Sequence, residues 1–300
     1  MATKVGPGRQ RGPRDGSRRF TPVAYRFDTR ANMLATSIEE DWERGISEQW
    51  RRNQSSIREV LIHQFGADHY EQKIQNFTDL GSAPWSVVAL HNVYLAQVRA
   101  AFVGMNYYAA LLGACGLGER ILNQLVLTLR DDYVEHEATS NVAEKQSFDN
   151  WHICIKALLA WGVFSNETAR NFTILMRRRH GAVHYRSELD SVDARTAALE
   201  VVVLLSRLIE IVFAPIGQRP CYFSGPIGRS YVRLDWEDEP FVKRFILPAC
   251  VLVSPIYRFV LSADEFDVYD DSDYGADQAP LTDEEFADPE RASPQVTYPF

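Results

Sequence analysis

The sequence predicts a predominantly α-helical protein with a small β-rich part near its C-terminus. Apolar residues recur at helical spacing through most of residues 37–216, and glycine, proline or a capping residue separates one run from the next. From residue 219 the pattern changes to alternating, β-branched and aromatic residues. Hydrophobic residues make up 46% of the chain, which is enough to fill a core. We therefore expect an up-and-down bundle of four to five helices, with an N-terminal helical extension and a β-rich C-terminal appendage.

The two ends of the chain carry opposite charges. Residues 1–30 contain eight Lys and Arg against two Asp, whereas residues 264–291 contain twelve Asp and Glu against one Arg. The formal net charge of −8 argues against a general nucleic-acid coat. Segments this rich in charge, with little apolar surface, are usually solvated or dock on a partner. We predict a flexible basic arm over residues 1–36, either an RNA tether or a solvated tail, and an acidic disordered tail over residues 263–300.

Residues 37–80 are predicted to form an N-terminal helical segment. Ser37 is a good N-cap, acidic residues follow it in the first turn, and apolar residues recur near helical spacing, so a helix is expected over residues 37–65. A shorter helix over residues 68–77 follows Gly66.

Residues 81–216 are predicted to form the bundle. Its first helix has Pro84 in the first turn, and its last helix is apolar nearly all round, so this last helix is either central in the bundle or part of a subunit interface. Three glycines in the second helix, Gly113, Gly116 and Gly118, indicate close packing against another helix. The expected helices cover residues 82–101, 105–133, 148–162, a segment capped by Ser165, and 191–213, capped by Ser191.

Residues 217–262 are predicted to form the β-rich appendage. The segment Tyr231–Asp235 alternates between apolar and polar residues, and residues 241–261 are rich in Val, Ile, Phe and Tyr. Because Pro248 and Pro255 interrupt the second stretch, we expect two or three bent or edge strands.

Several classes of protein are excluded by motifs that the sequence lacks. The four cysteines are far apart and form no CxxC pair, so a zinc site is not expected. No GxxxxGK[ST] phosphate loop is present, which argues against NTPase chemistry. No apolar run reaches ~18 residues, and the N-terminal stretch has no apolar core, so we expect neither a membrane span nor a secretory signal. The expected protein is soluble and cytoplasmic, with no metal and no cofactor.

The stretch with the most reactive side chains, RRRHGAVHYR, begins at Arg177. Four arginines and two histidines so close together indicate an anionic ligand, and phosphate is the obvious one. At ~100° per residue, Arg177, His180 and His184 share one face of a helix. Arg179 joins that face only through its long side chain or through a distortion at Gly181. A guanidinium and an imidazole that converge on one phosphate are suited to RNA cleavage, because imidazole exchanges protons near neutral pH and guanidinium stabilises a phosphorane.

Arg179 and His184, with the polar His180 directly after the arginine, resemble the motif of the HEPN superfamily: an arginine, a polar residue, a short variable segment and a histidine. Residues 104–130 also resemble the earlier helix of that family. The resemblance covers roughly residues 81–216. The resemblance implies a HEPN-like helical bundle. Many HEPN proteins are metal-independent endoribonucleases in which a homodimer brings the two copies of the motif together. Several act as toxins or antiphage defence effectors.

The resemblance also implies roles for individual residues. His184 would act as base or acid, Arg179 would hold the scissile phosphate and His180 would orient the pair, which leaves a 2′,3′-cyclic phosphate and a 5′-hydroxyl. Glu119 is expected among the substrate-binding residues, where it either pairs with an arginine of the basic stretch or has an ordinary surface partner one turn away. The residues expected to grip flanking phosphates or stack on a base are Arg177, Arg178, Tyr185 and Arg186.

Three other interpretations stay open. His180 and His184 have the spacing of metal ligands on a helix, although Gly181 stands where a zinc protease has Glu. The arginines could instead form a solvated face beside a packed His184. A HEPN module without catalysis would bind RNA or a nucleotide, or would assemble with a protein partner. The expected partners are therefore RNA, a second copy of the chain, and an antitoxin or regulatory protein.

Overall fold

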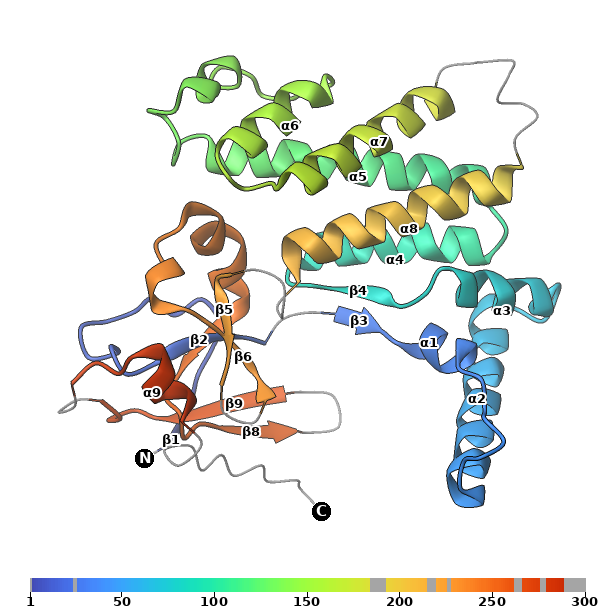
Figure 1. The fold of residues 1–300 in the computed structure, drawn as a ribbon, viewed down its shortest axis with the longest axis horizontal. Coiled ribbons are helices and arrows are strands. Elements are labelled where there is room, and N and C mark those ends of the chain that lie inside the picture. The colour runs from blue at the N-terminus through green and yellow to red at the C-terminus, as the bar shows by residue number, and fades with distance from the viewer. Residues whose placement is uncertain are drawn as a thin grey trace. The chain divides into compact units, whose positions relative to one another are not determined.

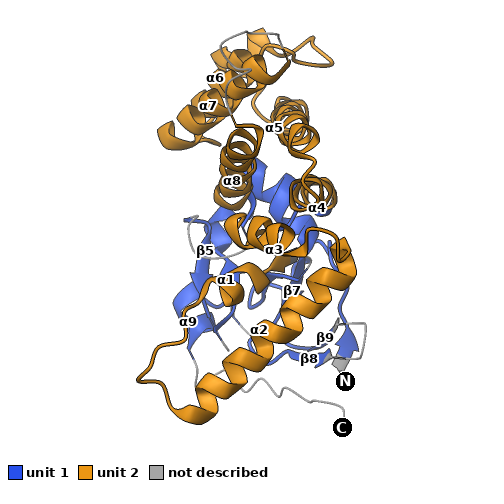
Figure 2. Ribbon diagram, turned by 90° about the vertical axis from the view of Figure 1, so that its right-hand side faces the viewer, with its two compact units in different colours: residues 1–25, 86–89, 213–300 blue, residues 26–85, 90–212 orange. Residues whose placement is uncertain are grey.

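The structure is a computed structural model that describes residues 2–23, 26–183, 193–214, 220–225, 228–261, 266–275 and 279–288. The chain divides into two compact units, which Figure 2 shows in different colours. The helical unit consists of residues 26–85 and 90–212, and the β unit consists of residues 1–25, 86–89 and 213–300. Helices dominate the described residues and the sheets are few and small, so the prediction of a predominantly α protein is confirmed (Figure 1).

The helical unit contains two groups of packed helices. Helices α1, α2 and α3 contact one another, and so do α5, α6 and α7. The N-terminal helical segment therefore shares a compact unit with the bundle helices, and the predicted boundary at residue 81 does not separate two units. The helices are α1 (Arg30–Ala35), α2 (Arg44–Phe65), α3 (Tyr70–Asp79), α4 (Ala89–Val103), α5 (Tyr107–Leu129), η1 (Glu137–Asn141), α6 (Trp151–Ala160), α7 (Asn166–Val183) and α8 (Ala194–Phe213).

Helix α2 begins later than predicted. It starts at Arg44 after Glu43, which makes no side-chain cap, so the prediction that Ser37 caps this helix is wrong. The side chain of Gln54 explains the difference, because its Nε2 donates to the carbonyl oxygens of Met33 and Thr36, both at 2.9 Å. These two bonds hold the chain after α1 in a non-helical path along α2.

The segment predicted to start the first bundle helix is a strand. Pro84 lies in β4 (Ala83–Ser86), which pairs with β3 (Arg26–Asp28), and helix α4 follows. The ring of Trp85 stacks on Phe27 with centroids 3.8 Å apart, so tertiary stacking stabilises the ribbon where a local proline signal indicated a helix.

The end of α6 and the start of α7 agree with the stop and cap residues predicted from the sequence. Gly162 has a φ of 75° after α6, and the Oγ of Ser165 accepts a hydrogen bond from the amide of Thr168 at 3.1 Å, which confirms its predicted cap. At the start of α8, Asp193 Oδ2 accepts from the amide of Thr196 at 2.9 Å. The predicted cap Ser191 lies outside the described residues.

Gly118 marks the closest packing of α5 against its neighbours. A Cβ there would lie 2.6 Å from Cδ2 of Leu175 and 3.1 Å from the ring of Trp151. We therefore expect Gly118→Ala to lower the free energy of unfolding by about 1–3 kcal/mol. The control Gly116→Ala, with nothing within 4 Å, should be neutral or stabilise by up to ~1 kcal/mol. Urea unfolding checks both variants, and equal effects would contradict the close approach.

The buried side chain of His91 makes the stability of the helical unit depend on pH. It is fully buried in α4, and its Nε2 donates to Oε1 of Gln124 at 2.7 Å. Burial, with a smaller contribution from Arg120, lowers the pKa of His91 from 6.5 to about 4, although the bond to Gln124 opposes this shift. Because the pKa is depressed, the neutral side chain stabilises the fold above pH 6.5. Stability should fall between pH 6.5 and about 4, by up to ~1.4 kcal/mol per pH unit from this group. His91→Gln should flatten that slope in urea titrations, and an unchanged slope would contradict this.

The β unit is built from short antiparallel strands that bring distant segments together. Its core holds Tyr231, Tyr257, Phe259 and Phe286 with neighbouring valines. The short helix α9 (Asp283–Ala287) begins with a capping box between Thr282 and Glu285. The paired strands are β1 (Ala2–Lys4), β9 (Phe266–Asp271) and β8 (Arg258–Leu261) in one sheet, β2 (Arg19–Pro22) with β7 (Cys250–Val253), and β5 (Tyr222–Ser224) with β6 (Ser230–Val232).

Two predictions about the ends of the chain are wrong over the described residues. Residues 1–36 are not a flexible arm, and residues 266–275 and 279–288 are not a disordered tail, because both segments are part of the folded β unit apart from α1 and β3. The physical reason is mutual neutralisation. Arg18, 2% exposed, pairs with Asp15 at 2.5 Å and with Asp270 at 2.9 Å, and Arg19, fully buried, pairs with Asp283 at 2.6 Å.

The predicted β-rich appendage is also larger and less extended than expected. It belongs to one compact unit with the N-terminal strands, so residues 217–262 do not form an appendage by themselves. Within it, residues 242–249 form π- and 3₁₀-helical turns, whereas strands were predicted from residue 241 onward. Strands β7 and β8 agree with the prediction.

Candidate functional site

The basic stretch lies at the C-terminal end of α7. The helix runs through Gly181 to Val183, so no break at Gly181 turns Arg179 towards the other side chains. Arg177, Arg178, Arg179 and His180 are among the described residues. The predicted residues His184, Tyr185 and Arg186 lie outside them, so the pairing of Arg179 with His184 stays a prediction.

Arg179 is held between two neighbouring helices. Its Nη2 lies 2.7 Å from Oε2 of Glu119 on α5, and both side chains are 27% exposed. Its guanidinium also lies over the ring of Trp151 at the start of α6, 5.8 Å from the centroid. The expectation that Glu119 pairs with an arginine of the basic stretch is therefore confirmed. Glu119 follows Gly118 directly, and the close packing at Gly118 is what lets α7 approach α5 here.

Three of the predicted residues line one hollow with the start of α6. Arg177, Arg179 and His180 lie on its α7 side, together with Met176. Arg177 is exposed and makes no ion pair with any residue that the structure describes. The α6 side of the hollow is made by Asp149, Asn150, Trp151 and His152. The hollow thus gathers two guanidinium groups and the imidazole rings of His152 and His180, beside the carboxylate of Asp149. The guanidinium groups are N–H donors of the kind that bind an anion.

Arg178 lies outside this hollow. Its Nη2 is 2.7 Å from Oε2 of Glu200 on α8, and both side chains are about half exposed. An exposed pair of this kind contributes little to stability, but it neutralises much of the charge that Arg178 would offer a ligand. The structure therefore does not bring Arg178 together with Arg177, Arg179 and His180.

Sequence reasoning missed the residues that α6 contributes. Asn150 caps α6 by accepting from the amide of His152 at 3.1 Å, and Trp151 is 1% exposed against α5 and α7. Asn150 was recognisable as a capping residue before an apolar helical run, but a cap signal says nothing about which other helix end lies beside it. Only the packing of α6 against α7 makes these residues part of the hollow.

A cysteine nucleophile is not favoured in this region. Burial raises the pKa of Cys115 to about 11, although the charge of Arg179 opposes the shift, and burial raises the pKa of Cys154 to about 12. Both thiols are therefore protonated at neutral pH, and a thiol is a much weaker nucleophile than a thiolate.

Over the described ranges, no group of three or more His, Cys, Asp or Glu residues has a geometry that could hold a metal ion. In the same ranges, no helix is both long enough and apolar enough to cross a membrane. Comparison of the chain with protein-family models, with curated proteins and with solved structures gives no match.

Proposed function

We propose that the chain is a metal-independent endoribonuclease of the HEPN type. The observation that carries the proposal is the hollow between α6 and α7, where Arg177, Arg179 and His180 meet and where Glu119 and Trp151 hold Arg179. A guanidinium held by packing and by an ion pair is preorganised for a phosphate, because its orientation costs little entropy when the ligand binds.

In this proposal the RNA supplies its own nucleophile. His184 takes the proton of the 2′-hydroxyl, whose oxygen then attacks the adjacent phosphorus. Arg179 stabilises the negative charge on the phosphorane, and the bond to the 5′-oxygen breaks as that oxygen takes a proton from solvent. His184 then releases to solvent the proton that it took from the 2′-hydroxyl. The products are a 2′,3′-cyclic phosphate and a 5′-hydroxyl, so no metal or other reactant is needed. His180 orients the groups, and Arg177 binds a flanking phosphate.

Glu119 limits how Arg179 can bind. Its Oε2 lies 2.7 Å from Nη2 of Arg179, so that part of the guanidinium is already bound. A phosphate therefore binds the remaining N–H groups or displaces Glu119. Displacement would release a carboxylate that is 27% exposed and therefore can turn to water. The ion pair also favours the second candidate, a HEPN module that binds RNA or a nucleotide without cleaving it, because a neutralised Arg179 stabilises a phosphorane less.

One experiment separates these two functions. Purified protein is incubated with tRNA or with total RNA in the presence of EDTA, and His184→Ala is treated in parallel. Cleavage with a cyclic-phosphate terminus that is lost in His184→Ala supports the nuclease. Retention of RNA without cleavage by both proteins, measured by gel shift, would support the binding module instead.

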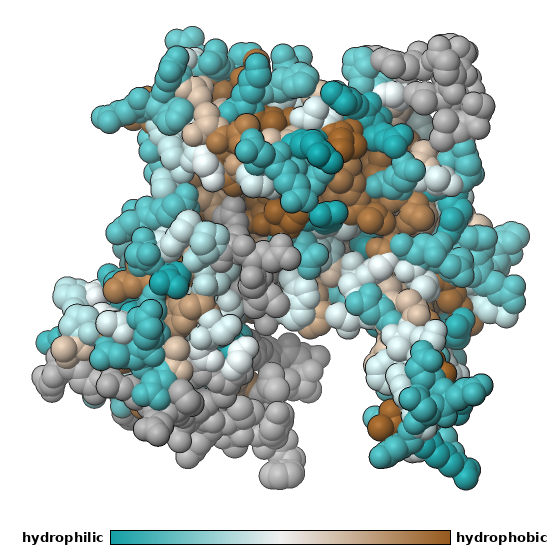
Figure 3. Space-filling view, in the orientation of Figure 1, coloured by the Kyte–Doolittle hydropathy of each residue, from teal (hydrophilic) through white to brown (hydrophobic). Residues whose placement is uncertain are grey.

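We further propose that the protein acts as a toxin or antiphage effector, controlled by an antitoxin or regulatory protein, and that it works as a homodimer. The apolar residues of α8 are mostly buried within the chain, which favours the central position over an interface. Hydrophobic residues nevertheless gather over the face of α7 and α8 in Figure 3, and Val203 and Val183 are 40% and 51% exposed. We expect light scattering at micromolar concentration to give twice the chain mass of 34.2 kDa. A mass of one chain would exclude the dimer.

A further inference from the structure

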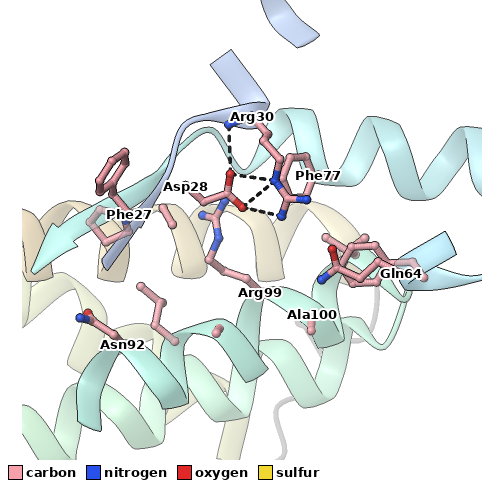
Figure 4. Close-up of a pocket in the computed structure, with 14 residues that line it drawn as sticks. Phe27, Asp28, Arg30, Gln64, Phe77, Asn92, Arg99 and Ala100 are labelled. Atoms are coloured by element: carbon pink, nitrogen blue, oxygen red, sulfur yellow. Dashed lines mark hydrogen bonds and ion pairs between the residues drawn. The ribbon is translucent and has the colours of Figure 1, made fainter. Parts of the chain in front are cut away.

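A second pocket lies in the helical unit, away from the basic stretch. Its floor is one face of α4, where residues recur at helical spacing, and its other walls come from the β3–β4 ribbon, the end of α2, and α3 (Figure 4). Ala96 and Ala100, one turn apart and both exposed, leave the space that larger side chains would fill. The apolar walls are Phe27, Phe65, Phe77, Pro84, Leu95 and Val103.

The polar groups of the pocket centre on Asp28. Arg30 donates to its carboxylate from Nε at 3.0 Å, from Nη2 at 2.7 Å and from the backbone amide at 3.0 Å. Burial raises the pKa of Asp28, but the hydrogen bonds and charges of Arg30 and the charge of Arg99 outweigh it, and the pKa is lowered. Asp28 is therefore ionised at neutral pH. Arg30 itself rests over the ring of Phe77, 5.2 Å from the centroid.

Arg99 adds a second positive charge on the other side of Asp28, as Figure 4 shows. It is 7% exposed, and its guanidinium donates to the carbonyl oxygens of Leu80 at 3.3 Å and of Gly81 at 2.5 Å, where α3 has ended. Burial lowers the pKa of Arg99 to about 10, although the charge of Asp28 opposes this, so Arg99 stays charged at neutral pH. Two guanidinium groups thus face one carboxylate.

Hydrogen-bonding capacity that Asp28 does not use lies on Arg30, and the exposed side-chain amide of Gln64 lines the same pocket. The Nε and Nη2 of Arg30 are used by Asp28, whereas its Nη1 makes no hydrogen bond to any residue that the structure describes, and the side chain is 33% exposed. The pocket therefore offers aromatic and aliphatic walls, one unused guanidinium edge and one uncompensated positive charge. Such a mainly apolar site with a few placed polar groups is typical of a small-ligand pocket.

We propose that this pocket binds a small organic monoanion with a flat apolar body, namely an aromatic monocarboxylate. The ring lies against Ala96, Ala100 and the surrounding phenylalanines, and the carboxylate accepts from the free edge of Arg30. A single negative charge balances the excess charge of the pocket, whereas a dianion would leave a net negative charge among apolar walls. The proposal is independent of RNA cleavage, since it rests on residues outside the basic stretch.

The charge requirement is tested with three matched probes on the full chain, by calorimetry or ligand-observed NMR. Phenylacetate should bind, and its neutral isostere phenylacetamide should bind at least about tenfold more weakly. Phenyl phosphate, largely dianionic at pH 8, should also bind more weakly than phenylacetate. The proposal is overturned if phenylacetate fails to bind at about 10 mM, if the amide binds equally well, or if phenyl phosphate binds more tightly.

The location is tested by filling the pocket. Ala100→Leu places three carbons into it from an exposed helix position, where leucine is well tolerated, and should weaken phenylacetate at least about tenfold. Ala96→Leu serves as a second filling variant should Ala100→Leu melt below the wild type. The matched control is Ala109→Leu at an exposed position of α5, which should bind within about twofold of the wild type. Wild-type affinity in a folded filling variant would overturn the assignment.

Discussion

Replacing Arg179 or His184 by alanine is expected to abolish RNA cleavage. Loss of the guanidinium removes charge stabilisation at the phosphate, and comparable losses lower kcat by about 10²–10³. Loss of the imidazole removes acid–base catalysis, which contributes about 10²–10⁴ in rate. Because both groups act on one transition state, the double variant should cleave RNA hardly more slowly than the slower of the two single variants. Rates are measured with EDTA present and with cyclic-phosphate termini as the readout.

The control for this prediction is another arginine of the same unit. Arg207 on α8 pairs with Glu167 at 2.9 Å, and both side chains are more than 60% exposed. Arg207→Ala removes the same charge and should cleave like the wild type, with an unchanged melting temperature. If His184→Ala cleaves normally with a native melt, the nuclease proposal fails. If His184→Ala unfolds, His184 is a packing residue, and the interpretation of the arginines as a solvated face replaces the nuclease proposal.

The largest loss of folding stability is expected from a substitution of Arg18 in the β unit. Its side chain is 2% exposed and bonds to Asp15, to Asp270 and to the backbone oxygen of Asp271. Arg18→Met keeps most of the volume but leaves the buried carboxylate of Asp270 without its cation, and leaves buried Asp15 with only the half-exposed Arg9 at 3.2 Å. Removing one partner of a buried ion group in this way costs about 3–5 kcal/mol. We expect a corresponding loss in the free energy of unfolding, measured in urea with a probe in the β unit, where the substitution lies.

The matched control is Arg44→Met, because Arg44 is 92% exposed and pairs only with Glu48 in the next turn of α2 among the described residues. This exposed pair is screened by water, so the change should leave the unfolding midpoint almost unaltered. Equal midpoints for the Arg18 and Arg44 variants would mean that the ends of the chain are not held by the buried ion group.

Local signals in the sequence were sufficient for most of the helices. The Ser165 cap, the Gly162 stop and the apolar spacing of α5 to α7 each depend on residues within one or two turns, so they can be recognised without knowing the fold. Gly113 and Gly118 were likewise recognised as packing glycines, whereas the same prediction for Gly116 is wrong, because a Cβ there would have nothing within 4 Å. Which helix packs at Gly118 could not be predicted, because Leu175 and Trp151 are brought to it only by the tertiary fold.

The basic stretch itself could be found from composition, but its surroundings could not. Four arginines in ten residues indicated an anion site. The sequence does not say that Arg179 turns to Glu119 and Trp151 while Arg178 turns to Glu200. These partners lie on three different helices, and the choice among them depends on the rotation of α7 about its axis, which packing sets.

Composition was misleading at the two ends of the chain. A basic head and an acidic tail each look unable to fold when considered alone, since neither has enough apolar surface to offset its loss of entropy. The tertiary structure places them in one unit, where Arg18 meets Asp270 across 252 positions of sequence. The buried charges of Arg18, Arg19 and Asp270 then have partners in place of water, and strands β1 and β2 find their partners in β9 and β7. The charge runs were determined by the sequence, whereas their mutual neutralisation was decided only by the fold, because ion pairing depends on distance in space.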